Sequence, residues 1–302
     1  MRPSRPSPRS AKGSWTSASP GSSGLGRAAL KDLAARHGIR PSKALGQSFL
    51  ADPNLARAIV ADAGIEERDR VLEVGPGLGS LTVALAATGA EVLAVELDRA
   101  VVPALREVLA PFPRVRIEVG DALRMDWDAA LSAGDWTMVS NLPYNVAVPL
   151  LVDMLDRAPR IGEYLVMVQR EVGERLTAQP GDDAYGAASV RVAYRARATL
   201  LRRVPPDVFW PRPKVESVMV RITPRPAPVD ADRAALFRVV DEGFAERRKT
   251  MGNALRRLGL DGPSAARVLR DNGLEPDVRA ERLGLPEFAR IAEALRREGV
   301  LA

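Results

Sequence analysis

Residues 71–79 have the sequence Val-Leu-Glu-Val-Gly-Pro-Gly-Leu-Gly. The run Val71–Val74 predicts a buried parallel strand, because it is short and mostly apolar. The glycines that follow allow the backbone to come close to a ligand. A helix is predicted from Ser80 to about Thr88, with Gly89 as its stop signal. A strand, a glycine loop and a helix in this order are typical of an α/β domain that binds a nucleoside.

An acid ends the next predicted strand, Glu91–Glu96. Glu96 follows Gly75 by 21 residues, the spacing at which an acid accepts hydrogen bonds from two ribose hydroxyls. The simpler alternative for Glu96 is a surface acid after a strand. The dinucleotide pattern GxGxxG is not met, because position 80 is Ser. The loop therefore favours S-adenosylmethionine over NAD.

Two further strands end in polar residues. Val115–Val119 leads into Asp121, which is placed to accept from the adenine amino group of a cofactor or, alternatively, to cap a helix. Trp136–Ser140 is the fourth predicted strand and leads into Asn-Leu-Pro-Tyr at 141–144. The carboxyl ends of neighbouring strands form the ligand-binding edge of an open α/β sheet, so these residues are expected to face one site.

The stretch 141–144 suits an aromatic ring that carries an amino group. The Asn141 side-chain oxygen and a backbone carbonyl can accept hydrogen bonds from such a group, and Pro143 fixes the backbone that presents the carbonyl. Tyr144 can stack on a flat heterocycle. Taken alone, however, the stretch is explained equally well as a strand that ends in a proline turn.

The remaining elements complete an α/β fold with a doubly wound, Rossmann-like sheet of seven strands. Three more strands are predicted at Tyr164–Gln169, Ala198–Val204 and Ser217–Ile222. Three prolines from Pro206 to Pro213 are expected to exclude regular structure around Phe209. Helices are predicted at Arg27–His37, Pro53–Ala63, Ala100–Leu109, Val148–Asp156, from Glu171 onward, and at Ala187–Tyr194.

The chain divides into three parts by composition. Residues 1–26 form a tail rich in Ser, Pro, Gly and Arg that we expect to be disordered, because it cannot bury enough apolar surface to fold. Residues 27–225 hold the cofactor-binding domain, and residues 226–302 are predicted to form a smaller all-α domain. The tail lacks a secretory h-region, and a cytosolic extension explains it better than a transit peptide. We expect a cytoplasmic protein with no membrane partner.

Composition excludes several chemistries. The chain has no cysteine and a single histidine, His37, so cysteine nucleophiles, disulfides and cysteine–zinc sites are absent, and no metal site is expected. The net charge of +6 is unevenly distributed. Residues 186–225 contain nine basic and two acidic residues, whereas residues 32–185 contain 15 basic and 23 acidic ones. The clustered basic stretch indicates a phosphate-binding surface.

The order of these motifs resembles that of class I S-adenosylmethionine-dependent methyltransferases, and more narrowly the ribosomal RNA adenine N6,N6-dimethyltransferase family. The resemblance covers about residues 40–300, and its C-terminal motifs favour the branch that modifies small-subunit (16S) RNA. The residues that carry it are Leu45–Leu50, Glu73–Gly79, Val95–Asp98, Gly120–Ala122, Asn141–Asn145, Phe209–Ser217, Arg247–Thr250, Asn253–Leu255 and Leu274–Glu281.

The resemblance implies methyl transfer from S-adenosylmethionine to the N6 atoms of two adjacent adenines of 16S RNA, within the small subunit or its precursor. Asn141 and the carbonyl of Leu142 or Pro143 would bind the amine, and Tyr144 and Phe209 would sandwich the base. For Phe209, a core aromatic beneath a proline loop is the alternative. The implied cofactor contacts are Ser48, Leu50, Gly75, Gly77, Glu96, Asp121 and Asn141.

One residue departs from the family pattern. Ser48 stands where the family commonly has Asn or His, which predicts a weaker or water-mediated cofactor contact. We expect a monomer. The candidate phosphate contacts, each of which can also be explained as part of a solvated charged face, are Arg202, Arg203, Arg212, Lys214, Arg247, Arg248 and Lys249.

Three other functions remain compatible with parts of this pattern. The first is the sister activity on large-subunit RNA. The second is a non-catalytic ribosome-assembly or transcription factor on the same fold, against which the intact motifs argue. The third is a NAD-dependent oxidoreductase, which the missing third glycine disfavours.

Overall fold

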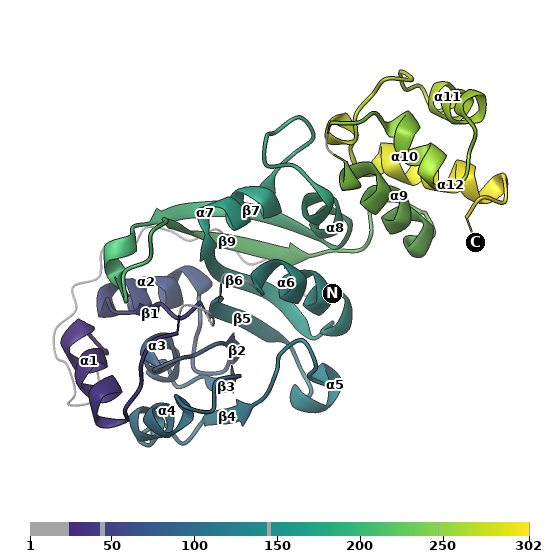
Figure 1. Cartoon of the computed structure of the whole chain (residues 1–302). Coiled ribbons are helices and arrows are strands. Elements are labelled where there is room, and N and C mark those ends of the chain that lie inside the picture. The colour runs from purple at the N-terminus through teal and green to yellow at the C-terminus, as the bar shows by residue number, and fades with distance from the viewer. Residues whose placement is uncertain (1–23, 43–45, 144–145, 247, 302) are drawn as a thin grey trace.

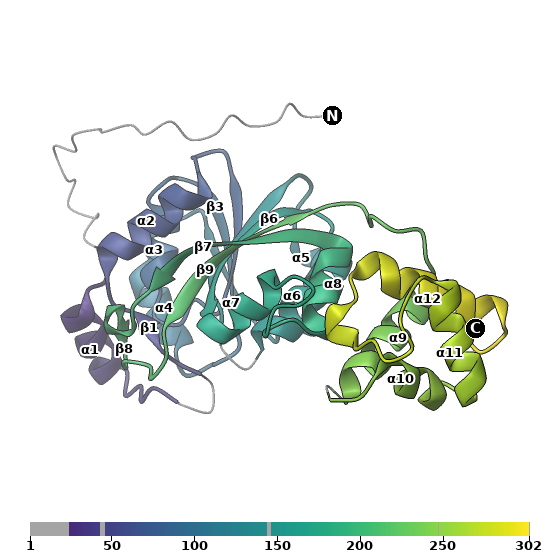
Figure 2. The ribbon, with the colours of Figure 1, turned by 90° about the horizontal axis from the view of Figure 1, so that it is seen from above.

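The computed structural model of the chain describes residues 24–42, 46–143, 146–246 and 248–301 (Figure 1). Tyr144, Arg247 and the predicted tail up to residue 23 lie outside these ranges. The described residues form one large sheet with helices on both faces and a cluster of helices at one end (Figure 2).

The large sheet confirms the predicted seven-stranded, doubly wound architecture. Its strands lie in the order β4-β3-β2-β5-β6-β9-β7, and the five from β4 to β6 are mutually parallel. Their bounds are β2 Arg70–Val74, β3 Glu91–Glu96, β4 Val115–Val119, β5 Trp136–Asn141, β6 Ile161–Gln169, β7 Ala196–Val204 and β9 Ser217–Pro224.

Strand β9 departs from the parallel pattern. It runs antiparallel to both of its neighbours, β6 and β7. Residues 205–216, which connect β7 to β9, contain no crossover helix, and parallel neighbours require one. The chain therefore returns directly beside β7, and this connection becomes a loop at the edge of the sheet.

Helices cover the two faces of the sheet and enclose one core layer on each. One layer holds apolar side chains of α2 (Pro53–Ala63) and α3 (Ser80–Ala86), against which α4 (Val102–Leu109) packs. The opposite layer holds Trp127, Trp136 and Tyr164 together with side chains of α5 Trp127–Ala130, α6 Ala147–Arg157, α7 Arg170–Thr177 and α8 Ala187–Arg195. Alternate residues of the strands enter alternate layers.

The neighbouring strands β2 and β5 separate at their carboxyl ends. Their ladder pairs Val71 with Thr137 and Leu72 with Met138 and goes no further. Beyond that point the Ser140 hydroxyl takes the place of a backbone acceptor, because its Oγ accepts from the Val74 N–H at 2.9 Å. A cleft can therefore form between Gly75 and Asn141, where open α/β sheets bind their ligands.

A second, two-stranded sheet corrects the expectation of irregular structure around Phe209. After a short 3-10 turn at Pro206–Val208, strand β8 (Phe209–Trp210) pairs antiparallel with β1 (Phe49–Leu50). The prolines flank this strand and do not interrupt it, so its backbone groups stay available for pairing. The sheet joins the segment after helix α1 (Arg27–Arg36) to the loop between β7 and β9.

The last part of the described chain is helical, as predicted. It contains α9 Arg233–Ala245, α10 Met251–Arg257, α11 Gly262–Asp271, a 3-10 turn at Ala280–Arg282 and α12 Leu285–Arg297. These helices cluster beyond α8 (Figure 2) and share an apolar core with it, including an edge-to-face contact between Tyr194 and Phe237. No helix in the described ranges is long and apolar enough to cross a membrane.

Candidate active site

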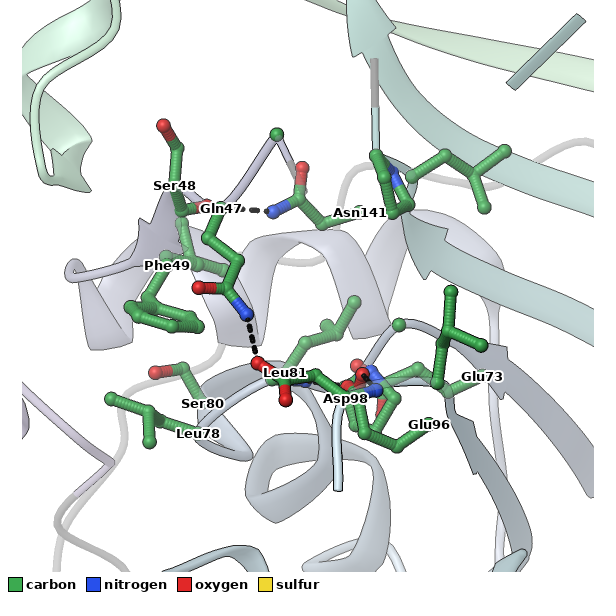
Figure 3. A pocket seen from close by; sticks show the side chains of 18 of the residues that line it. Gln47, Ser48, Phe49, Glu73, Leu78, Ser80, Leu81, Glu96, Asp98 and Asn141 are labelled. Carbon is green, nitrogen blue, oxygen red and sulfur yellow. Dashed lines mark hydrogen bonds between the residues drawn. The ribbon is translucent and has the colours of Figure 1, made fainter. Parts of the chain in front are cut away.

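One cleft brings together most of the predicted cofactor and base contacts. It lies at the carboxyl ends of β2, β3 and β5 and is covered by the segment Gly46–Leu50 (Figure 3). The sequence-predicted residues that line it are Ser48, Leu50, Gly75, Gly77, Glu96, Asn141, Leu142 and Pro143. The structure thus places the glycine loop and the Asn-Leu-Pro stretch on opposite walls of a single site.

The glycine loop passes between two rings. Gly75 has φ of 74°, and a Cβ atom there would lie 3.3 Å from the Pro143 ring. Gly77 has φ of 57°, and a Cβ atom there would lie 2.7 Å from the Phe49 ring. A side chain at either position would be both strained and crowded. Glycine is therefore needed at both positions for the loop to pack against the Pro143 and Phe49 rings.

The Glu96 side chain is oriented by two backbone donors. It is 6% exposed, and its two oxygens accept from Gly77 N at 2.9 Å and from Asp98 N at 2.8 Å. Burial raises the pKa of Glu96, and these backbone donors oppose that rise. Each carboxylate oxygen keeps a further lone pair that can accept a hydroxyl. The geometry is compatible with the predicted ribose contact.

The Asn141 amide is oriented by a backbone carbonyl. Its Nδ2 donates to the Ser48 carbonyl at 3.2 Å (Figure 3). A carbonyl can only accept, so the amide nitrogen must face Ser48 and Oδ1 is left as an acceptor on the other side. Ser48 thereby has a role that depends on its main chain and not on its unusual side chain. A direct cofactor contact by the Ser48 hydroxyl stays a prediction.

Gln47 and Glu73 are polar residues of the cleft that were not given a role from the sequence. Gln47 donates from Nε2 to Asp98 Oδ2 at 2.7 Å and accepts from Ser42 N at 2.8 Å, which holds the covering segment against the end of β3 (Figure 3). Glu73 is 1% exposed, and burial raises its pKa to about 8. An acid inside the apolar run Val71–Val74 was the available signal for Glu73, because unpaired acids are rarely buried.

Asp121 lies outside the lining of this cleft. Its Oδ1 accepts from Leu123 N at 3.0 Å, and its Oδ2 is 3.6 Å from the Arg124 guanidinium. This is a capping arrangement of the kind considered as the alternative, here at a turn instead of a helix. The predicted contact between Asp121 and the cofactor adenine stays a prediction.

Phe209 also lies away from the cleft surface. Its side chain has no exposed area and belongs to the core layer that contains Ile59 and Met219. This placement matches the alternative of a core aromatic beneath a proline loop. Stacking on a base would require the ring to leave this layer, so that role stays a prediction. The neighbouring Trp210 is partly exposed and contacts Phe49, with ring centroids 6.1 Å apart.

The predicted phosphate contacts fall into two groups. Arg203, Arg212, Lys214, Arg248 and Lys249 are exposed and have no ion-pair partner within the part of the chain that the structure describes. Arg202 instead lies 2.6 Å from Asp62 of α2. Other cations of the basic stretch are also paired, namely Arg191 with Asp241, Arg195 with Asp156 and Arg221 with Glu163. The free positive charge is therefore smaller than the sequence count indicates.

Comparison with known proteins gives a consistent result. A family model described as ribosomal RNA adenine dimethylase matches residues 39–297. The ribosomal RNA small subunit methyltransferase A of Cutibacterium acnes is 42% identical over 287 residues, which cover 92% of this chain and 96% of that protein. The protein of the same name from Kineococcus radiotolerans is 46% identical over 269 residues, covering 87% of this chain and 89% of that protein.

Solved structures share the fold. A dimethyladenosine transferase from Plasmodium falciparum matches with a TM-score of 0.70 at 22% identity, covering 83% of this chain and 98% of that chain. The 23S rRNA methyltransferase ErmE matches with a TM-score of 0.62 at 23% identity, covering 82% of this chain and 99% of that chain. At these identities the likeness establishes the architecture and leaves the substrate to be argued separately.

Proposed function

The chain belongs to the ribosomal RNA adenine dimethylase family, as its motifs predicted, and on this premise we propose that it dimethylates N6 of two adjacent adenines of small-subunit (16S) ribosomal RNA. The enzyme is an rRNA adenine dimethyltransferase that uses S-adenosylmethionine. The names of the relatives favour the small subunit over the large one. We place the reaction on the small subunit or its precursor in the cytoplasm.

One observation carries the proposal, namely the two walls of a single cleft. The glycine loop and Glu96 form a nucleoside wall, and Asn141, Leu142 and Pro143 form the other. Gly75 is close enough to Pro143 that even a methyl group would crowd the contact. A cofactor held on the first wall and an amine held on the second are therefore brought next to each other.

The second wall is suited to activating an adenine amine. That amine is a poor nucleophile because its lone pair is delocalised into the ring. S-adenosylmethionine, when bound, supplies a methyl group on a positively charged sulfur. Asn141 Oδ1 and a backbone carbonyl would accept the two N–H groups and localise the lone pair on nitrogen. Because the Pro143 carbonyl already accepts from Val146 N at 3.3 Å, the Leu142 carbonyl is the better second acceptor.

Positioning supplies the main acceleration in this proposal. Holding two reactants in line can contribute roughly 7–11 kcal/mol in favourable cases. No histidine or cysteine is needed as a base, because the amine loses its proton only after the methyl group has been transferred. Tyr144 is proposed to stack on the flipped base, a contact worth about 1–3 kcal/mol. Phe209 would add a second stack only after leaving the core.

We assign RNA recognition to two exposed regions. One is the loop between β7 and β9, which carries Arg212 and Lys214 beside Arg203 at the end of β7. The other is the helical part α9–α12, with Arg248 and Lys249 before α10. Exposed cations without an ion-pair partner are available to bind phosphate, and this binding is driven by the release of counterions. Arg202 contributes only if its pair with Asp62 opens, and Arg247 is included on its sequence position alone.

Asn141→Ala is the variant with the largest expected effect on turnover. It removes both the acceptor for the amine and the bond to Ser48. We expect kcat to fall by about 10²–10³, as when one preorganised hydrogen-bonding group is lost from an active site. The matched control is Asn272→Ala, which removes a similar amide-to-carbonyl bond (2.8 Å to Val268) in the helical part and should keep normal turnover. Thermal unfolding of both variants checks the fold.

The substrate is tested by mapping. Small and large ribosomal subunits that lack the modification are incubated with the protein and methyl-labelled S-adenosylmethionine, and N6,N6-dimethyladenosine is located by primer extension and mass spectrometry. Two adjacent dimethylated adenines in small-subunit RNA are expected. Modification confined to large-subunit RNA would establish the sister activity. Binding of RNA without any methyl incorporation would establish a non-catalytic factor.

A further inference from the structure

Glu73 is a buried acid that the proposed chemistry does not use. It lies in β2 two residues before Gly75, is 1% exposed and lines the cleft. Within the described residues its Oε2 has no hydrogen-bond partner. An acid buried in this way is costly to keep unless it has a ligand or a function. Glu73 therefore requires an explanation beyond packing.

The cleft around Glu73 carries only one sign of charge. Its titratable lining residues are Glu73, Glu96 and Asp98, and none of the described lining residues is basic. Thr82 of α3 faces Glu73, and Glu96 of β3 is the charged group that acts on it. An acidic cleft with no basic residue fits a cationic ligand. S-adenosylmethionine is such a ligand, because its sulfonium and ammonium groups outnumber its carboxylate.

The three acids are not equivalent. Glu96 accepts from two backbone N–H groups, and Asp98 accepts from Gln47 Nε2 and from Ala100 N at 2.9 Å. Glu73 has no such backbone donors at Oε2, which lacks a hydrogen-bond partner among the described residues, and the Thr82 hydroxyl is the donor group that faces its carboxyl. Burial, with the nearby charge of Glu96, raises the pKa of Glu73 to about 8. This rise favours the protonated form of Glu73 in the free protein at neutral pH.

We propose that Glu73 is the counter-ion of the cofactor: it is neutral in the free protein and gives up its proton when the cationic methionine end of S-adenosylmethionine fills the cleft. The proton passes from the carboxyl group to solvent, and no other bond is made or broken. This inference rests on the proposed function, because that function supplies the cofactor. The alternative is a permanently protonated core acid that packs against Thr82.

The proposal fixes the sign of a pH dependence. Below about pH 8 the cofactor must displace a proton from Glu73, so its affinity rises as the pH is raised. The rise is at most about tenfold per pH unit for a single proton. Above about pH 9 the free protein is already ionised at Glu73, and this source of pH dependence disappears. A permanently protonated acid would add no such dependence at neutral pH.

Calorimetry of the full-length protein tests this directly. S-adenosylmethionine is titrated at pH 7 in two buffers of different ionisation enthalpy, and the difference in heat gives the protons released. We expect close to one proton for the wild type and close to none for Glu73→Gln. The matched control is Glu118→Gln, which removes an exposed carboxyl from β4 of the same sheet and should leave proton release unchanged.

The outcomes separate this inference from the proposed function. Cofactor binding without proton release in the wild type, or equal release in Glu73→Gln, overturns the counter-ion role and leaves the methyltransferase proposal intact. No cofactor binding at all contradicts the proposed function instead. A parallel titration with S-adenosylhomocysteine identifies the cation: release with both ligands assigns the ammonium group, and release with S-adenosylmethionine alone assigns the sulfonium.

A measurement without cofactor guards against a folding defect in Glu73→Gln. A carboxyl with a raised folded-state pKa favours folding below its ordinary value of 4.5, and this contribution is lost as pH rises to about 8. The variant has no such group. Its Tm relative to the wild type should therefore increase from pH 6 to pH 9. A constant difference in Tm across this range contradicts a raised pKa of Glu73. A second test needs no variant: the wild type should release a proton on cofactor binding at pH 7 but not at pH 9.

Discussion

The cleft and the loop between β7 and β9 are joined by the small β1–β8 sheet, because β1 lies in the segment that covers the cleft, but their polar side chains are held in different ways. In the cleft, Glu96, Gln47 and Asn141 each have a partner that fixes their direction. On the loop, Arg212 and Lys214 are exposed and have no ion pair with any described residue.

This difference matches the two kinds of ligand. A small cofactor gains most from groups that are already in place, because nothing has to be ordered when it binds. A long polyanion gains from hydrated cations that exchange water and counterions for phosphate. The cleft is therefore preformed, and we expect the RNA surface to be completed by the RNA itself.

A substitution of Phe209 tests whether this residue belongs to the protein core or to the RNA-binding loop between β7 and β9. Its side chain is fully buried, so Phe209→Ala should lower the free energy of unfolding by about 3–5 kcal/mol, the usual effect of emptying an aromatic core site. Urea unfolding measures this change. The matched control is Trp210→Ala on the same strand, whose partly exposed ring should give a smaller loss.

The affinities of Phe209→Ala for the cofactor and for RNA then show to which region Phe209 belongs. Equal losses of cofactor and RNA affinity in Phe209→Ala would place it in the shared core. A selective loss of RNA affinity with little change in stability would instead show that the ring leaves the core to stack on the base, and the boundary would have to be moved to include Phe209 in the RNA surface.

The cofactor wall could be predicted well because its signals are local. The spacing from Gly75 to Glu96 follows from the length of the loop, helix and strand that connect them. Gly75 and Gly77 adopt positive φ, which glycine tolerates and other residue types rarely do. Partners distant in sequence were not predictable in this way. The bond from Asn141 to the Ser48 carbonyl joins residues 93 positions apart and depends on a main chain that carries no residue signature.

Glu96→Ala should separate the two ligands. It removes a carboxylate that holds the glycine loop and, in the proposal, the ribose, so cofactor affinity should fall by roughly tenfold to a hundredfold. RNA affinity should stay within about twofold of the wild type. Glu91→Ala, at the opposite end of the same strand and paired with Arg70, is the matched control and should bind both ligands normally.

Calorimetry and RNA filter binding provide the two measurements for Glu96→Ala. If the RNA affinity fell together with the cofactor affinity, the two regions would be coupled, and the β1–β8 sheet would be the obvious route. An unchanged cofactor affinity would exclude the ribose contact.

The RNA surface was harder to predict because charge alone does not tell a free cation from a paired one. Nine basic residues within 186–225 gave a strong signal from the sequence. In the structure, Arg191, Arg195, Arg202 and Arg221 have acidic partners on other elements. Those partners, among them Asp62 and Asp156, lie far away in the sequence, so only the fold identifies which charges are left for RNA.

Arg202 and Arg203 form the finest test of the contrast, because they are adjacent on β7 and differ in pairing. Arg203→Gln should weaken RNA binding a few-fold and reduce the slope of log affinity against log salt by about 0.7–0.9, the loss of one phosphate contact. Arg202→Gln should change this slope less and destabilise the fold by about 1 kcal/mol, because it breaks a partly buried pair with Asp62. Fluorescence anisotropy with a small-subunit RNA fragment over a KCl series measures both slopes. Equal slopes for the two variants would mean that the pair opens when RNA binds, and pairing in the free protein would no longer mark which cations recognise phosphate.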